Sequence, residues 1–161
     1  GFWHAHMGWL FENDGKSDHA LMHDFAKYPE LVWLDEHWLV PPLALAVIVG
    51  VTLGWSALFF GFGVGTIALW HGTFTVNSIA HLIGSRRYAT QDTSKNCVWL
   101  IPVTLGECWH NNHHYFMGSA RQGFYWWEID VSYYVLRVLA FFGLVWDIKE
   151  PPAKVYSQAS L

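Results

Sequence analysis

The sequence has few charged residues, and one long stretch of it has none. Asp, Glu, Lys and Arg make up 14% of the 161 residues, against about 25% in a typical soluble domain. None of the four occurs between Glu36 and Arg86. That run is about twice the roughly 20 residues that cross a bilayer as one helix. The pattern argues against an ordinary soluble domain and favours a membrane protein.

Cysteine is scarce, and basic residues do not dominate. Cys97 and Cys108 are the two cysteines, which is too few for a disulfide framework, so we expect two reduced thiols. The net charge is −4 with histidine neutral. Proteins that bind nucleic acid usually present a basic face, so no nucleic-acid partner is expected.

Turn residues divide the uncharged run into two expected helices. Two prolines at 41–42 suit the start of a helix, and Thr52-Leu53-Gly54-Trp55 suits a hairpin turn. The second helix is expected from about residue 56 to His81. We therefore predict an all-α integral membrane protein with a two-helix transmembrane hairpin over about 38–83. By the positive-inside rule the polar end faces the cytoplasm, because basic residues follow it: Arg86, Arg87 and Lys95.

The remainder is expected to form a cytoplasmic cap over about 84–150, within a single domain of residues 1–161. Residues 88–124 are rich in polar and turn residues and are predicted to be loop. Residues 126–146 are predicted to form one helix. Asp130 and Arg137 favour an amphipathic helix at the membrane surface over a third span. The tail from Lys149 is expected to be poorly ordered.

Ten histidines occur in the chain, and they are unevenly spread. The densest group is His110-Asn111-Asn112-His113-His114, in which His110 and His114 lie one helical turn apart. Neutral imidazoles placed in this way bind first-row metal ions. Asn77 and His81 are also four residues apart, at the polar end of the second membrane helix, where polar groups are costly and usually functional. The pattern predicts a metal site.

The two motifs stand in an order that resembles the membrane-bound fatty-acid desaturases of the delta-9 type. Asn77-Ser78-Ile79-Ala80-His81 is similar to the third metal motif of that family, and residues 106–114, Gly-Glu-Cys-Trp-His-Asn-Asn-His-His, to the last. Residues 1–9 are similar to the segment that follows the family's second histidine box. The resemblance covers the whole chain and leads us to expect the C-terminal part of such a protein.

The resemblance implies a centre of two non-haem iron ions that uses O₂. It implies that four histidines are ligands and that Asn77 holds a water molecule against one iron; the four are His81, His110, His113 and His114. It also implies further ligands from two upstream histidine boxes that the chain does not contain. We therefore expect this chain alone to be inactive.

The resemblance further implies a fatty-acyl substrate into which a double bond is introduced. Thr73 and Phe74 stand where the family has a Thr-Trp pair at the bend of the acyl channel. The acyl carrier stays open between CoA, lipid and carrier protein. Electrons are expected from an external donor such as cytochrome b5 or a ferredoxin, and membrane lipid is expected around the hairpin.

Several assignments stay open at this point. Asp92 and Glu107 either orient a ligand imidazole or are solvated acids. His4, His6, His19 and His23 are expected to lie on the surface or to support the ligand histidines. His37 and His71 are expected to be structural, with His71 a weaker candidate for lining a substrate channel. The alternatives for the whole chain are a related di-iron hydroxylase, a non-catalytic membrane remnant that binds zinc or haem, and a hairpin whose histidines have no role. Product analysis separates the first alternative, and metal identity the others.

Overall fold

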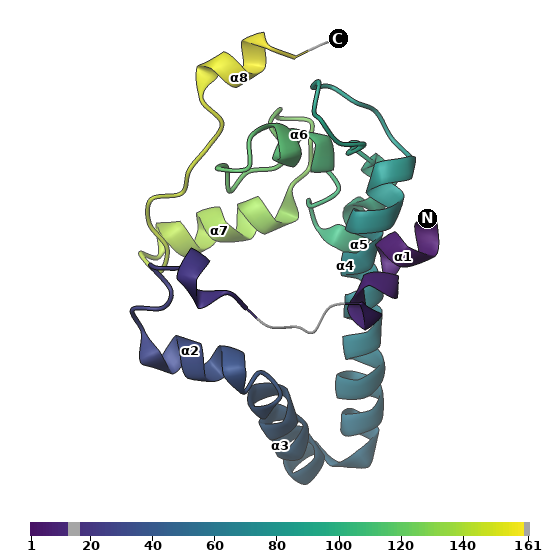
Figure 1. Cartoon of the computed structure of the whole chain (residues 1–161), viewed down its shortest axis with the longest axis vertical. Coiled ribbons are helices and arrows are strands. Elements are labelled where there is room, and N and C mark those ends of the chain that lie inside the picture. The colour runs from purple at the N-terminus through teal and green to yellow at the C-terminus, as the bar shows by residue number, and fades with distance from the viewer. Residues whose placement is uncertain (13–16, 160–161) are drawn as a thin grey trace. The chain divides into compact units, whose positions relative to one another are not determined.

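The computed structural model describes residues 1–12 and 17–159, and Figure 1 shows the order of its elements. These residues form helices and loops without a β-strand; Asn96 makes isolated bridges to Ser85 and Trp109. The prediction of an all-helical chain is confirmed for this part. The chain divides into two compact units, Gly8–Trp70 and a second made of Gly1–Met7 with His71–Leu161.

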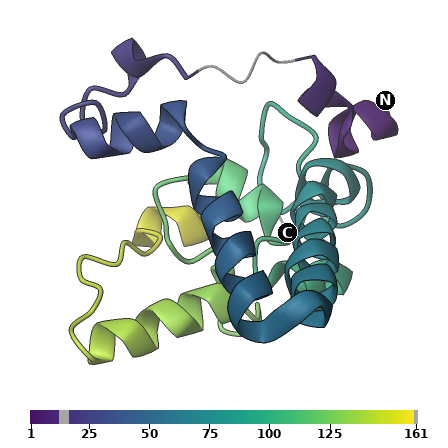
Figure 2. The same ribbon diagram turned by 90° about the horizontal axis from the view of Figure 1, so that it is seen from below.

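The unit Gly8–Trp70 is built around a reversal of the chain. Its elements are η1 (Gly8–Phe11), η2 (His19–Leu21), α2 (Pro29–Glu36), α3 (Val40–Ser56), the π-helix η3 (Ala57–Val64) and the start of α4 (Gly65–Leu82). Gly54 has φ 84° and ψ 179°, a conformation that essentially only glycine adopts. After it the chain runs back along α3, as Figures 1 and 2 show, and a Cβ on Gly50 would lie 3.3 Å from the Leu58 side chain.

Among the described residues, Val40–Leu82 is the one helical segment long and apolar enough to cross a membrane, judged by length and composition. It has 43 residues, and none of its most apolar window is buried. The break at Gly54 lies inside this segment. It falls within Thr52–Trp55, where the sequence predicts a turn.

The other unit contains the C-terminal half of α4 and several short helices. These are α1 (Phe2–His6), η4 (Val98–Leu100), α5 (Ile101–Thr104), α6 (His110–Tyr115), α7 (Val131–Phe141) and α8 (Ala153–Ser157). Two small apolar clusters hold them. One joins α4 to the segments around Cys97 and Cys108, which are buried free thiols, and includes Ala80, Leu100 and Trp109. The other places Val155 against Tyr88 and Phe124.

Three sequence-based expectations for this unit need correction. Residues 88–124 contain η4, α5 and α6 in addition to loop. The helix predicted over 126–146 is shorter: Asp130 caps it by accepting a hydrogen bond from the Tyr133 N–H at 2.9 Å, and it ends before Gly143, which has φ 71°. The tail was expected to be poorly ordered, but its described part, residues 149–159, contains α8, in which Val155 is 1% exposed; residues 160–161 lie outside the described residues.

Candidate metal site

Three histidines from two helices converge in the second unit. His81 lies in the last turn of α4, and His110 and His114 lie in α6. The Nε2 atoms of His81 and His110 are 3.0 Å apart. One possible ligand nitrogen from each of the three rings lies within 4.8 Å of the others. The structure thus brings together three of the four histidines predicted as ligands.

The distance between the Nε2 atoms of His81 and His110 has a chemical consequence. Two imidazole nitrogens at 3.0 Å cannot both present lone pairs to each other, so either one carries a proton or both bind a cation. Burial, followed by the repulsion of three neighbouring histidines, lowers the pKa of His110 to about 3. His110 is therefore neutral near pH 7, which is the state that binds metal.

His113 and Asn77 stand beside this cluster. The His113 ring centre is 6.2 Å from that of His110 and 5.8 Å from that of His114. Its Nδ1 is buried and has no hydrogen-bond partner among the described residues, and burial lowers its pKa. Asn77 is exposed and precedes His81 by one turn of α4. Neither residue belongs to the group of three.

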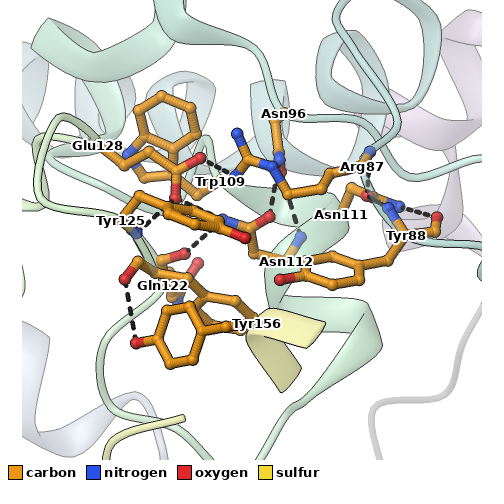
Figure 3. Close-up of polar contacts among 12 residues, drawn as sticks. Arg87, Tyr88, Asn96, Trp109, Asn111, Asn112, Gln122, Tyr125, Glu128 and Tyr156 are labelled. Carbon is orange, nitrogen blue, oxygen red and sulfur yellow. Dashed lines mark hydrogen bonds and ion pairs between the residues drawn. The ribbon is translucent and has the colours of Figure 1, made fainter. Parts of the chain in front are cut away.

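Helix α6 forms because its two asparagines bond to the surrounding chain. A helix of six residues has little stability of its own. The Asn111 carboxamide oxygen accepts the backbone N–H groups of Arg87 and Tyr88, both at 2.8 Å, and its Nδ2 donates to the Tyr88 carbonyl at 3.0 Å. Asn112 Oδ1 accepts from Asn96 Nδ2 at 2.7 Å. Figure 3 shows both side chains pointing into this network.

Glu128 closes the same network from the other side. Its buried carboxylate accepts hydrogen bonds from the Arg87 guanidinium, from Asn112 Nδ2 at 2.9 Å and from the Tyr125 N–H at 3.1 Å. A buried carboxylate is tolerated only when it is paired in this way. This network was not predicted from the sequence. The only available signal was the position of two asparagines between metal-type histidines.

The loop after α4 contacts two of the three rings. Asp92 Oδ2 accepts a hydrogen bond from His114 Nδ1 at 2.6 Å, and Thr93 Oγ1 lies 3.1 Å from His81 Nδ1. Burial raises the pKa of Asp92, but hydrogen bonds from Ser94 and His114 outweigh it and hold that pKa below its usual value. Of the two acids considered from sequence, Asp92 is therefore the one bonded to an imidazole. The pKa of Glu107 is raised by burial and then by Asp130.

A second pair of histidines lies outside this cluster. His6 Nε2 is 3.0 Å from His71 Nδ1, and His6 Nδ1 is 2.9 Å from the Ser78 hydroxyl. Both rings contact Phe74 edge-on. Phe74 is half-buried and Thr73 is exposed on α4. Phe74, one of the two predicted substrate residues, therefore lies against His6, which was expected on the surface or in support of the ligands, and His71, which was expected to be structural.

Convergent imidazoles at the end of a long apolar helical segment place the chain among helical proteins with a histidine cluster that could hold a metal ion. No protein-family model matches the chain. Several curated relatives do, and they are named as desaturases. The sn-2 palmitoyl-lipid 9-desaturase of Nostoc sp. (strain 36) is 36% identical over an alignment of 159 residues, and the match covers 94% of this chain and 55% of the relative.

Two plant relatives agree with this match. The chloroplastic palmitoyl-monogalactosyldiacylglycerol delta-7 desaturase of Arabidopsis thaliana is 38% identical over 155 residues, 94% of this chain and 42% of the relative. The icosanoyl-CoA 5-desaturase of Limnanthes douglasii is 35% identical over an alignment of 158 residues, and the match covers 94% of this chain and 44% of the relative. The chain belongs to the fatty-acid desaturase family. It spans about half the length of the curated relatives it matches.

The ligand nitrogens of the candidate site are suitable for iron, which is the metal that the desaturase family suggests. Imidazole nitrogens are good ligands for iron as well as for zinc and copper. The unpaired, buried Nδ1 of His113 is a further nitrogen without an internal partner among the described residues. The three converging rings could hold one ion.

Proposed function

We propose that this chain is the part of a membrane fatty-acyl desaturase that supplies His81, His110, His113 and His114 to a centre of two iron ions. One observation carries the proposal. In a chain of the desaturase family, ligand nitrogens of His81, His110 and His114 lie within 4.8 Å of one another although the helices that hold them are far apart in sequence. Asn77 is proposed to act through a bound water molecule.

The chemistry explains why histidines are needed here. Bound iron supplies, with O₂, the oxidising power that breaks unactivated C–H bonds, which acid and base side chains lack. Two hydrogens leave adjacent carbons of the acyl chain, and O₂ becomes two water molecules. Two of the four electrons come from the acyl chain, and two electrons with two protons come from outside. The residues of this chain hold, orient and shield the ligand nitrogens.

The acyl chain is proposed to pass Thr73 and Phe74 on α4, where Phe74 lies against the rings of His6 and His71. The relatives are named for palmitoyl-lipid, palmitoyl-monogalactosyldiacylglycerol and icosanoyl-CoA substrates. The proposal therefore extends to a fatty-acyl substrate on a lipid or CoA carrier. The electron donor is proposed to be a separate protein such as cytochrome b5 or a ferredoxin.

A two-span hairpin is proposed for the segment Val40–Leu82. The 14 residues of α3 that precede Gly54, from Val40 to Leu53, are about 21 Å long at 1.5 Å each. The π-helix η3 and α4, with 8 and 18 residues, together reach about 39 Å if α-helical spacing is assumed. The hydrocarbon core is about 30 Å thick. Arg86 and Arg87 follow α4, which supports a cytoplasmic position for the metal site.

A chimera tests the proposed activity. The matching region of the Nostoc relative is replaced by this chain, and the chimera is expressed in a host that lacks the activity. We expect a new double bond in the host's acyl chains, detected by gas chromatography with mass spectrometry. The chimera with His110→Ala should give none.

Two other results are informative. A hydroxylated acyl chain would favour the hydroxylase alternative. An inserted, full-length chimera that yields no product would contradict the proposal. The 161-residue chain by itself is expected to give no product with acyl substrate, reductant and O₂, because it lacks the other ligand boxes that the family resemblance implies.

A further inference from the structure

We propose that Thr93, together with Asp92, sets which nitrogen of two metal-site histidines faces the metal. Both are positioning residues: they hold His81 and His114 with Nδ1 turned to the loop and Nε2 turned to the site. The inference rests on the proposed function and deepens it. It assigns a role to an exposed threonine that no motif includes.

The contact of Asp92 leaves one tautomer for His114. An ionised carboxylate only accepts hydrogen bonds, so the bond of 2.6 Å from His114 Nδ1 to Asp92 Oδ2 requires a proton on Nδ1. The Nε2 of a neutral His114 then carries the lone pair. This arrangement of carboxylate, imidazole and metal is common in metal sites and raises the basicity of the ligand.

The contact of Thr93 favours the tautomer of His81 with the proton on Nδ1 once a cation is bound. A hydroxyl can donate or accept, so the 3.1 Å contact alone does not fix the tautomer. The opposite nitrogen of His81 lies 3.0 Å from His110 Nε2, in the centre of the site. When both of these Nε2 atoms bind a cation, the proton of His81 must be on Nδ1. Thr93 Oγ1 then accepts it, so that no N–H group is left unpaired.

The loop that holds these two acceptors is itself fixed. Asp92 Oδ1 accepts the Ser94 N–H at 2.8 Å, and Ser94 is fully buried. The Lys95 N–H donates to the Ala80 carbonyl at 2.8 Å, which joins the loop to α4 next to His81. A ligand held by a fixed partner binds metal better than one that must first be ordered. Adjacent residues of one loop thus orient a ring from α4 and a ring from α6.

The test uses the whole 161-residue chain in detergent micelles with Co²⁺ alone as the probe. Optical titration gives the affinity of the wild type, Thr93→Val, Thr93→Ser and a matched control, Thr52→Val. Thr52 donates to the Ile48 carbonyl inside α3. Loss of the hydrogen-bond partner of a metal-ligating histidine typically weakens metal binding by about 10- to 100-fold. A loss of this size is expected for Thr93→Val. Serine keeps the hydroxyl and should restore near-wild-type affinity, and Thr52→Val should match the wild type.

A second readout separates this role from a purely structural one. Nuclear magnetic resonance of the imidazole nitrogens, with Zn²⁺ bound, reports which nitrogen carries the proton. We expect Nδ1–H on both His81 and His114 and an unchanged thermal midpoint for metal-free Thr93→Val. Binding through Nδ1, or equal affinity of Thr93→Val and wild type, would overturn the inference and leave the proposed function standing. A wild-type chain that binds no Co²⁺ would overturn both.

Discussion

Asn111 and Asn112 separate the metal-site histidines of α6, and both are 0% exposed. Their side chains form hydrogen bonds with neighbouring segments, and these bonds hold the short helix in place of the backbone hydrogen bonds of a longer helix. A buried amide that loses its partners costs free energy, because each donor and acceptor was removed from water on folding. The histidines thus depend on residues that bind no metal.

Replacing Asn112 should destabilise the chain strongly. Asn112→Leu removes the partners of Asn96 and Glu128 and leaves a carboxylate short of a donor. We expect a loss of about 3 kcal/mol in the free energy of unfolding. Denaturant unfolding in micelles measures it. Gln91→Ala, on the exposed part of the loop, serves as the control and should change stability by less than about 0.5 kcal/mol. Equal stability of the two variants would show that the network is not stabilising.

Protonation of His110 should destabilise the metal-free chain in acid. Its pKa is about 3 in the folded chain, mainly because of burial, and about 6.5 when unfolded. The unfolded state therefore binds more protons between these values. The contribution of His110 to the free energy of unfolding is fully present above about pH 6.5. It falls with decreasing pH, by at most about 1.4 kcal/mol per pH unit. Unfolding measured from pH 7 to 4 should show this slope, and His110→Gln should reduce it. An unchanged slope in His110→Gln would show that another group causes the loss of stability in acid.

The sequence indicated which histidines converge at the candidate site better than it indicated the residues that support them. His81, His110 and His114 could be identified because histidine is rare and its spacing is informative. Asp92 was one of two candidate acids, since nothing in a sequence tells which acid reaches a ring. Thr93 gave no signal, because a hydroxyl in a polar loop is ordinary. Such contacts depend on the path of the loop, which tertiary packing determines.

At the scale of elements, the reversal of the chain near the end of α3 depends on one backbone conformation. Gly54 combines φ 84° with ψ 179°. Gly61, in the π-helix, lies in open space, and a Cβ there would contact nothing within 4 Å. The two glycines provide a matched pair, because alanine would be strained at the first and free at the second.

We therefore expect Gly54→Ala to destabilise the unit Gly8–Trp70 by about 1–3 kcal/mol, the usual cost of a residue forced into such a conformation. Gly61→Ala should be neutral or slightly stabilising, since alanine favours helix. Thermal unfolding followed by circular dichroism compares them. If Gly61→Ala were the more damaging change, the reversal would not depend on Gly54.

Element prediction succeeded where a strong local signal exists. The turn at Thr52–Trp55 was visible because glycine interrupts an apolar run. The short helices α5, α6 and α8 have 4, 6 and 5 residues, too few to show a periodic pattern. Helix α8 exists because Val155 packs against Tyr88 and Phe124. Contacts between distant segments, which local pattern does not encode, produced each of these errors.

At the scale of the whole molecule, the candidate site joins segments that are distant in sequence. His81 and His110 are 29 residues apart, and the loop with Asp92 lies between them. A metal ion bound to these rings is bound only by the folded chain, because unfolding separates the ligands. Binding and folding are therefore linked, and the ion should stabilise the fold in proportion to its concentration.

The expected size of this linkage follows from mass action. At a free Co²⁺ concentration 100 times the dissociation constant, the fold should gain about 2.7 kcal/mol, and the thermal midpoint should rise with concentration. A chelator should reverse the rise. His110→Ala should abolish it, whereas His37→Ala, at the end of α2, should retain it. A rise that persists in His110→Ala would mean that the ion binds elsewhere, for example at His6 and His71. No rise in the wild type would contradict a metal site at these three rings.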